Sequence, residues 1–317
     1  MLVLNIVILL VSLFLIIKFS DVFVDAAVSI AESFRVPKMV IALTVAAFAT
    51  CAPELAISFN SISSGNSEMT LANVIGSSII NILLIIGISA VVKPIKLKEQ
   101  SIKKELPLLV LITTAFFFLI SDSFFKSSLP NSLSRSDGII LIIWFITFCV
   151  YIFSISKRNI ELFPKKPKFT KKQSIIRSVI AVVGIIVTSD LIVDSAIYIA
   201  ESLNISQKII AMTIIVIGTS LPELTITVLS AKKGEFDMAI GNIVGTNIFN
   251  ICIVLGLPVT IFGTISSSAF NLVDLVVVLL AALLLFLFGR SNKELTRREG
   301  IIMILVVVVY YIYIFLN

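Results

Sequence analysis

Two glutamates deep inside apolar stretches are the residues of this sequence most suited to chemistry. Glu54 follows Pro53 and Glu223 follows Pro222, each in a run made mostly of aliphatic residues. An ionisable group in the middle of a membrane helix costs at least ~2.5 kcal/mol on insertion scales, so it indicates a functional site. The alternative is a protonated structural glutamate bonded to a neighbouring helix, but two matching positions argue against it.

The residues around the glutamates supply further oxygen atoms. A proline inside a helix frees carbonyl groups one turn earlier, although a plain kink is the alternative. Free carbonyls at membrane depth persist where they line a cavity. Hydroxyl and amide side chains recur at four-residue spacing, which places them on shared helix faces. With the glutamates, these faces comprise Thr50, Glu54 and Ser58; Asn73, Ser77 and Asn81; Thr219, Glu223 and Thr227; and Asn242, Thr246 and Asn250.

Ordinary helix packing competes with ligand binding as the role of some of these residues. Small polar side chains often form hydrogen bonds between membrane helices, and this interpretation suits Asn73 and Asn242. The other serine, threonine and asparagine positions are assigned to the site because each set faces a glutamate. Gly76 and Gly245 are expected to let helices approach closely.

Carboxylate, hydroxyl, amide and carbonyl oxygens are ligands for hard cations such as Ca²⁺. The sequence contains no histidine, which excludes histidine-ligated transition metals and serine–histidine hydrolysis. Two glutamates supply two negative charges, which balance one Ca²⁺ or two Na⁺. Competition of both loads for one charge pair predicts an exchanger of inorganic cations without a cofactor.

The composition indicates an all-α integral membrane protein. Of the 317 residues, 58% are hydrophobic and 14% charged, whereas soluble domains have roughly 45–50% and about 25%. A spanning helix needs about 20 apolar residues. Ten spans are predicted, over 2–33, 36–63, 69–92, 105–121, 138–156, 174–202, 206–230, 237–261, 270–289 and 299–316.

The basic residues predict how these spans are oriented. When loops are assigned alternately with the N-terminus outside, 21 of the 25 lysines and arginines fall inside, as topology rules require. Both termini are therefore expected outside, and the basic loop 157–173 in the cytoplasm. The basic residues of the cytoplasmic loops explain the net charge of +6, so no nucleic-acid partner is expected. Nothing in the sequence indicates an obligatory protein partner. The lysine- and isoleucine-rich usage is typical of prokaryotes, so we expect a plasma membrane.

The two halves of the chain repeat each other at a constant offset of 169 residues. Between Ser20 and Ser89 this offset gives 26 identities in 70 positions, shared Asp, Glu, Asn, Pro and Gly among them, and a repeat at a fixed offset indicates repeated architecture. Equivalent spans are five apart, so the halves have opposite orientation, as in many secondary transporters. The predicted units are residues 1–156 with a motif at 44–82, the linker 157–173, and residues 174–317 with a motif at 213–251.

The motifs resemble the α-repeats of the Ca²⁺/cation antiporter superfamily, in particular the prokaryotic sodium/calcium exchanger branch. The matching segments are Gly218-Thr219-Ser220-Leu221-Pro222-Glu223 and Gly241-Asn242-Ile243-Val244-Gly245-Thr246-Asn247. The resemblance implies alternating-access antiport, typically Na⁺ in for Ca²⁺ out, with the long first and sixth helices sliding. It implies ion ligation by Thr50, Glu54, Ser77, Asn81, Thr219, Ser220, Glu223, Thr246 and Asn250.

The first repeat departs from the family pattern, and these departures leave alternatives open. Ala49 and Cys51 replace glycine and serine, while Ala72 and Ser78 replace glycine and asparagine. A thiol is a soft, weak ligand for Na⁺, so Cys51 is expected to weaken one Na⁺ position. The first rival function is Ca²⁺/H⁺ exchange on the same fold. The second is a cation channel, and an intramembrane enzyme comes last because no catalytic dyad is apparent.

Overall fold

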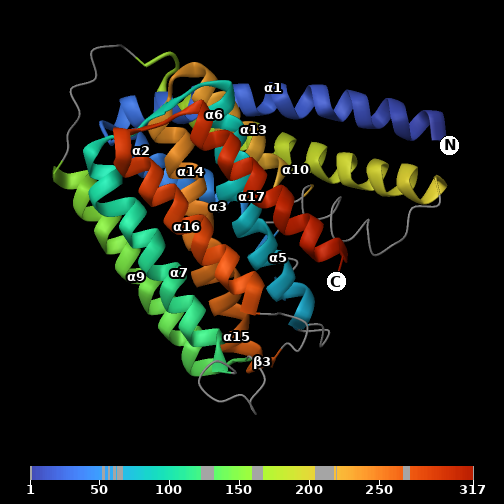
Figure 1. Cartoon of the computed structure of the whole chain (residues 1–317). Helices are drawn as coiled ribbons and strands as arrows, with labels where there is room; N and C mark the ends of the chain where they lie inside the picture. Colours follow the sequence, from blue (N-terminus) through green and yellow to red (C-terminus); the bar gives the residue numbers. More distant parts are fainter. Residues whose placement is uncertain are drawn as a thin grey trace.

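The computed structural model of the chain is a bundle of helices with two long helices lying across it (Figure 1). The structure describes residues 2–51, 54–55, 58–59, 62, 67–122, 132–158, 167–203, 218, 220–266 and 272–316. The first half contains α1 (Leu2–Phe34), α2 (Lys38–Ile41), the π-helix η1 (Ala42–Ala46), α3 (Ala47–Thr50), α5 (Ser67–Ile79), the π-helix η2 (Ile80–Ile85), α6 (Ile86–Val92), β1 (Ile95–Lys96), the π-helix η3 (Ser101–Glu105), α7 (Leu106–Ile120), β2 (Ser132–Leu133) and α9 (Arg135–Arg158).

Among the described residues, the second half also begins with a long helix and contains an α-helix interrupted by a π-helix, followed by two further helices. It contains α10 (Lys171–Ser202), α13 (Leu221–Lys233), α14 (Phe236–Phe249), the π-helix η5 (Asn250–Leu255), α15 (Gly256–Phe262), β3 (Ile265–Ser266), α16 (Leu272–Asn292), β4 (Glu294–Leu295) and α17 (Arg297–Leu316).

Six helical stretches in the described part of the chain are long and apolar enough to cross a membrane. They are Leu2–Phe34, Thr70–Val92, Arg135–Ser154, Lys171–Ile192, Phe236–Phe262 and Leu272–Asn292. The protein is therefore mainly helical and built for a bilayer. The count of ten spans stays a prediction. In the predicted span 206–230, most residues before Leu221 lie outside the described part of the chain, and so do parts of the predicted span 36–63.

The spans differ in how much of each lies inside the protein. In the most apolar 18-residue window of each span, 78% of the residues are buried for Thr70–Val92 and 83% for Phe236–Phe262, but only 11% for Leu2–Phe34. Buried apolar spans form the centre of the bundle, and the exposed faces of α1 and α10 present aliphatic side chains such as Val3 and Val179. The central pair of spans carries the predicted second polar face of each half, so the packing places those residues in the interior.

The two long helices, α1 and α10, lie side by side and run in opposite directions (Figure 1). Lys171, at the start of α10, stacks on the ring of Phe34 at the end of α1. Further along the crossing, a Cβ added to Gly184 would meet the ring of Phe19 at 2.5 Å. A side chain at position 184 would therefore require the ring of Phe19 to move.

Two further helix crossings depend on glycines that are 169 residues apart. A Cβ on Gly87 of α6 would lie 2.9 Å from the carbonyl oxygen of Gly300 on α17. A Cβ on Gly256 of α15 would lie 3.2 Å from the carbonyl oxygen of Gly138 on α9. Each short helix after a π-helix thus packs backbone to backbone against the last long helix of a half, as small residues allow in membranes.

Short antiparallel strand pairs join the two halves of the chain at their loops. Ile95 of β1 pairs with Leu295 of β4, and Leu133 of β2 pairs with Ile265 of β3. Each pair links a loop of the first half with a loop of the second. These ladders satisfy backbone groups where the chain leaves the helices.

Ion pairs gather at the end of α1 that follows Asp21. Lys233 bridges to Asp21 at 2.9 Å and to Asp25 at 2.5 Å, and Lys168 also reaches Asp25 at 2.5 Å. In addition, Lys38 at the start of α2 pairs with Glu235, the residue before α14, at 2.6 Å. The long helix α1 is therefore tied to α13 and to the residues that precede α10.

Candidate cation-binding site

Glu54 follows a short break in the helix of the first half. Helix α3 ends at Thr50, and Cys51 adopts φ −83° and ψ −1°, a sparsely populated conformation in which many active-site residues are found. The backbone N–H of Leu55 then donates to the carbonyl of Cys51 at 3.0 Å. This local geometry turns the chain so that Glu54 becomes fully buried, with 1% of its surface exposed.

The second half has the same break at the equivalent position. Ser220 adopts φ −90° and ψ 5°, and α13 begins at Leu221. The backbone N–H of Leu224 donates to the carbonyl of Ser220 at 3.0 Å. Pro222 lies in the first turn of α13, where its missing N–H removes no helical hydrogen bond. Pro222 is thus placed at the start of α13, and Thr219, just before Ser220, lies outside the described residues.

The start of α13 also influences the charge of Glu223. This glutamate is in the first turn of the helix, and the positive end of a helix dipole stabilises a negative charge there. Its side chain is completely buried. Glu54 and Glu223 are close enough to interact electrostatically, and Cys51 interacts with both. The break therefore brings one carboxyl group from each half to a common interior region.

Many buried oxygens of the predicted site residues have no hydrogen-bond partner in the described part of the chain. Both carboxyl oxygens of Glu223 and Oε2 of Glu54 are among them. An unpaired buried polar group costs about 1–3 kcal/mol and a charged one costs more. The neutral oxygens in the same condition are Oδ1 of Asn81, Oγ of Ser220, Oγ1 of Thr246 and Oδ1 of Asn250. Oxygens left unpaired inside a protein are what a cation site requires.

Two of these ligand candidates lie in π-helical turns. Asn81 is in η2 and Asn250 begins η5. A π-helical turn inside an α-helix is uncommon and is frequent at functional sites. Its wider hydrogen-bond spacing turns the asparagine side chains away from the regular helical positions. The two asparagines are exactly one repeat offset apart, so both halves present an amide oxygen from the same kind of turn.

Direct contacts connect the polar residues of one half with those of the other. The amide nitrogen of Asn250 donates to Oγ of Ser77 at 3.1 Å. The thiol of Cys51 lies 3.9 Å from the carbonyl oxygen of Thr246 and donates to it. A Cβ on Gly245 would lie 2.9 Å from the carbonyl oxygen of Leu43, so this glycine allows α14 to approach η1 and α3.

Some polar residues predicted on the same helix faces serve packing instead. The amide of Asn242 donates to Oγ1 of Thr227 at 3.1 Å, which is the interhelical hydrogen bond expected for it. In the first half, Asn73 and Ser58 are buried, but Nδ2 of Asn73 and Oγ of Ser58 have no described partner. Among the described residues, the second half thus pairs the amide nitrogen that stays unpaired in the first, although Oδ1 of Asn242 also has no partner there.

Two of the predicted site residues, Pro53 and Thr219, lie outside the described part of the chain, so their roles stay predictions. Gly76 is partly exposed, and its close-packing role also stays a prediction. Thr50 is buried and its hydroxyl donates to the carbonyl of Ala47 at 3.2 Å, which leaves its oxygen lone pairs available to a cation.

Sequence reasoning left out two kinds of buried polar group. Asn247 is buried next to Thr246 with an unpaired Oδ1, and its place in the second motif could have indicated it. Glu105 is fully buried and accepts a hydrogen bond from the hydroxyl of Tyr151 at 2.7 Å. Asp274, which lies 169 residues after Glu105, accepts one from Tyr310 at 2.8 Å, and the repeat of the acidic position was the available signal.

The described residues hold no group of three or more Cys, Asp or Glu side chains arranged for a metal ion. A cation placed among these residues would meet two carboxyl groups together with neutral oxygens. Such a mixed set suits hard, weakly held ions that must leave again. It does not suit a resident transition metal, which prefers sulfur or imidazole ligands.

Comparison with known proteins identifies the family of the chain. Residues 4–154 and 173–316 match the family described as "Sodium/calcium exchanger protein". The chain belongs to this family. It is 31% identical to the inner membrane protein YrbG of Escherichia coli, covering 93% of this chain and 92% of that protein. It is 28% identical to the sodium/calcium exchanger MaX1 of Methanosarcina acetivorans, covering 99% of both.

Solved structures of the sodium–calcium exchanger NCX_Mj share the fold of this family member. A structure of NCX_Mj soaked with Na⁺ and no Ca²⁺ superposes with a TM-score of 0.84, at 30% identity over 98% of both chains. A structure soaked with Na⁺ and Sr²⁺ gives a TM-score of 0.85 at 29% identity. The resemblance indicated by the two motifs is thereby confirmed, and the chain is a multi-pass membrane protein of a cation antiporter family.

The hydrogen bond between Asn250 and Ser77 is expected to couple the two halves energetically. Ser77→Ala leaves the buried amide of Asn250 unpaired, so it should lower the free energy of unfolding by about 1–3 kcal/mol. A double-mutant cycle with Asn250→Ala should give a coupling energy of about 0.5–3 kcal/mol, measured by denaturant unfolding in detergent micelles. A parallel cycle with the exposed Thr147→Ala is the control and should give no coupling. Additive effects of Ser77→Ala and Asn250→Ala would refute the contact.

Proposed function

We propose that this exchanger family member exchanges Ca²⁺ for Na⁺ by alternating access at the site around Glu54 and Glu223. The observation that carries the proposal is the pair of buried carboxyl groups, of which both oxygens of Glu223 and Oε2 of Glu54 have no described hydrogen-bond partner. Either one Ca²⁺ or two Na⁺ would neutralise this pair, so the two loads compete. An empty site would keep two negative charges in an apolar interior. This cost disfavours the switch of the empty site from one side of the membrane to the other.

The full ligand set belongs to the same proposal. We infer that Thr50, Ser77, Asn81, Thr219, Ser220, Thr246 and Asn250 complete the coordination by the glutamates. The buried, unpaired oxygens of Asn81, Ser220, Thr246 and Asn250 support this assignment. The relatives MaX1 and NCX_Mj are named for sodium and calcium exchange, which favours the same two ions as the cargo here.

We also propose ten spans in two five-helix repeats of opposite orientation, divided as 1–156 and 174–317. The antiparallel packing of α1 with α10, and the glycine crossings at Gly87 and Gly256, support it. Both marked chain ends lie toward the same side of Figure 1, in keeping with termini on one side of the membrane. The outside location of those termini, the cytoplasmic linker 157–173 and a plasma membrane location rest on charge distribution and composition.

Proton coupling is the second candidate function. Cys51 stands where the family pattern has serine, and its thiol donates to a carbonyl instead of offering a hard oxygen. A weakened Na⁺ position would leave the glutamates themselves to carry protons in exchange for Ca²⁺. A cation channel on this fold is less favoured, because two charges at a repeat interface suit alternating occupancy better than continuous conduction.

Ion flux into proteoliposomes of the purified protein separates these functions. With an outward Na⁺ gradient, ⁴⁵Ca²⁺ uptake should greatly exceed uptake without any gradient, because Na⁺ leaving the site makes it available to Ca²⁺. Uptake driven only by an outward H⁺ gradient would replace Na⁺ with protons as the counter-ion. Equal uptake with and without gradients would establish a channel and refute exchange.

Removing the charge of either glutamate should abolish transport and leave the fold intact. Glu54→Gln and Glu223→Gln each keep the size of the side chain but leave one negative charge, which cannot balance Ca²⁺. Uptake of ⁴⁵Ca²⁺ in proteoliposomes should fall to background, while the elution profile in detergent stays that of a folded monodisperse protein. Glu99→Gln, an exposed carboxylate paired with Lys103, is the matched control and should transport normally. Exchange at the unaltered rate by both site variants would disprove the assignment.

Replacing the thiol near both glutamates should strengthen the coupling to Na⁺. Cys51→Ser offers a hard oxygen where the native side chain offers sulfur, so the Na⁺ concentration that gives half-maximal Ca²⁺ uptake should decrease. Cys149→Ser, an exposed cysteine on α9, controls for loss of a thiol elsewhere. An unchanged Na⁺ dependence would mean that position 51 does not contact the ion.

A further inference from the structure

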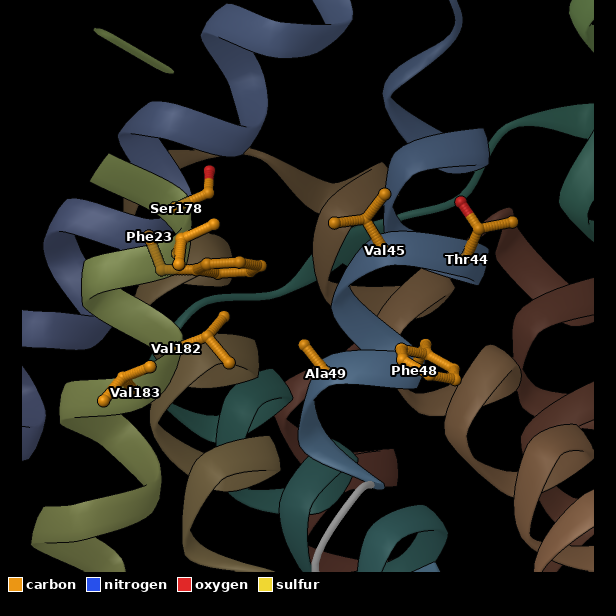
Figure 2. A pocket seen from close by; sticks show the side chains of 9 residues that line it. Phe23, Thr44, Val45, Phe48, Ala49, Ser178, Val182 and Val183 are labelled. Carbon is orange, nitrogen blue, oxygen red and sulfur yellow. The ribbon is translucent and has the colours of Figure 1, made fainter. Parts of the chain in front are cut away.

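An apolar groove opens between α10 and the helical segment formed by η1 and α3. Its volume is about 460 Å³, within the range of about 300–1,000 Å³ typical of ligand pockets. Figure 2 shows Val182 and Val183 on one wall and Val45 and Ala49 on the other. Phe23 of α1 also lines it. Three segments far apart in sequence therefore enclose one groove beside the helix that leads to Glu54.

The groove faces the part of the surface that a bilayer covers. Phe48, Val179 and Val183 line it and have 61%, 59% and 55% of their surfaces exposed. All three are apolar, and Val179 and Val183 belong to a stretch of α10 that qualifies as a membrane span. Lipid tails rather than water surround such a surface. An empty groove would deprive its lining of van der Waals contacts, so a flexible acyl chain is its natural occupant.

One end of the groove is polar. Ser178 is 6% exposed, and its hydroxyl has no hydrogen-bond partner among the described residues. Figure 2 places Ser178 at the same end as Thr44, whose hydroxyl is already bonded to the carbonyl of Val40 at 2.6 Å. Ser178 is thus a buried donor available to a molecule in the groove.

Positive charge lies beyond this polar end. Lys172 is exposed and precedes Val179 by two helical turns on the same stripe of α10. That separation is about 10 Å along the axis. Basic residues next to the end of a membrane helix attract anionic lipid headgroups. The apolar groove, the unpaired hydroxyl and the lysine therefore follow one another in the order of the tail, ester and phosphate of a phospholipid.

We propose that this groove binds one acyl chain of an anionic phospholipid, with its headgroup at Lys172 and its ester region near Ser178. The binding site rests on the membrane location of α10 and not on the transported ions. Its consequence rests on the proposed exchange: a chain lodged between α10 and α3 must yield when α10 slides, so lipid composition should alter the exchange rate.

Photo-crosslinking tests the site without relying on transport. The purified full-length protein in detergent is mixed with phosphatidylglycerol that carries a photoreactive group in one acyl chain, irradiated, and mapped by peptide mass spectrometry. Adducts should concentrate on residues 44–49 and 178–183. Excess unlabelled phosphatidylglycerol should remove them, and excess phosphatidylcholine should not. Val187, exposed on α10 and not among the lining residues, reports labelling by unbound lipid.

Two variants complete the test. Val182→Trp fills the groove and should reduce adducts several-fold, while Val187→Trp should leave them unchanged. Lys172→Gln changes an exposed side chain that folding does not require, and it should abolish the preference for phosphatidylglycerol. Labelling at Val187 equal to that in the groove, or equal competition by phosphatidylcholine, would overturn the proposal. Absence of Ca²⁺ exchange alongside specific crosslinks would refute the proposed function and leave the lipid site standing.

Discussion

The structure depends on holding two carboxyl groups in an interior where no described lysine or arginine pairs with them. Glu54 and Glu223 are both buried, and burying charge without compensation is among the largest penalties in protein energetics. The protein reduces that penalty by placing Glu223 in the first turn of α13, where the helix dipole is favourable. The negative charge that is not compensated in this way would attract a cation, as proposed for the site.

The remaining architecture follows from delivering one glutamate from each half. Each needs a helix break directly before it, and Cys51 and Ser220 adopt nearly the same backbone angles one repeat offset apart. The breaks bring the two halves into contact, and glycines allow the helices to meet, as at Gly245 against Leu43. The bond from Asn250 to Ser77 then joins the polar faces of both halves. A movement of one half relative to the other therefore shifts the oxygens around the glutamates.

Hydropathy predicted the extent of most spans because the bilayer imposes length and apolarity on each helix separately. The span expected over 138–156 is α9, and the span expected over 237–261 is the continuous helix from Phe236 to Phe262. The π-helical turns at Asn81 and Asn250 were not predicted, since they depend on packing rather than on local periodicity. The contact between Asn250 and Ser77 joins residues 173 apart, and the repeat matched each with its own counterpart rather than with the other.

The two halves have diverged where their environments differ. The amide nitrogen of Asn242 donates to Thr227 in the second half, whereas the amide nitrogen of the equivalent Asn73 has no partner among the described residues. Cys51 replaces the hydroxyl that Ser220 provides in the second half and turns its thiol to the carbonyl of Thr246. The first half therefore offers fewer hard oxygens but retains its carboxylate. This loss should weaken the binding of a divalent ion only a little, because its binding depends mainly on the two carboxylates. It should weaken the binding of a monovalent ion more, because that binding depends on the neutral ligands. Under the proposed exchange, the asymmetry of the repeats is therefore expected to weaken Na⁺ binding more than Ca²⁺ binding.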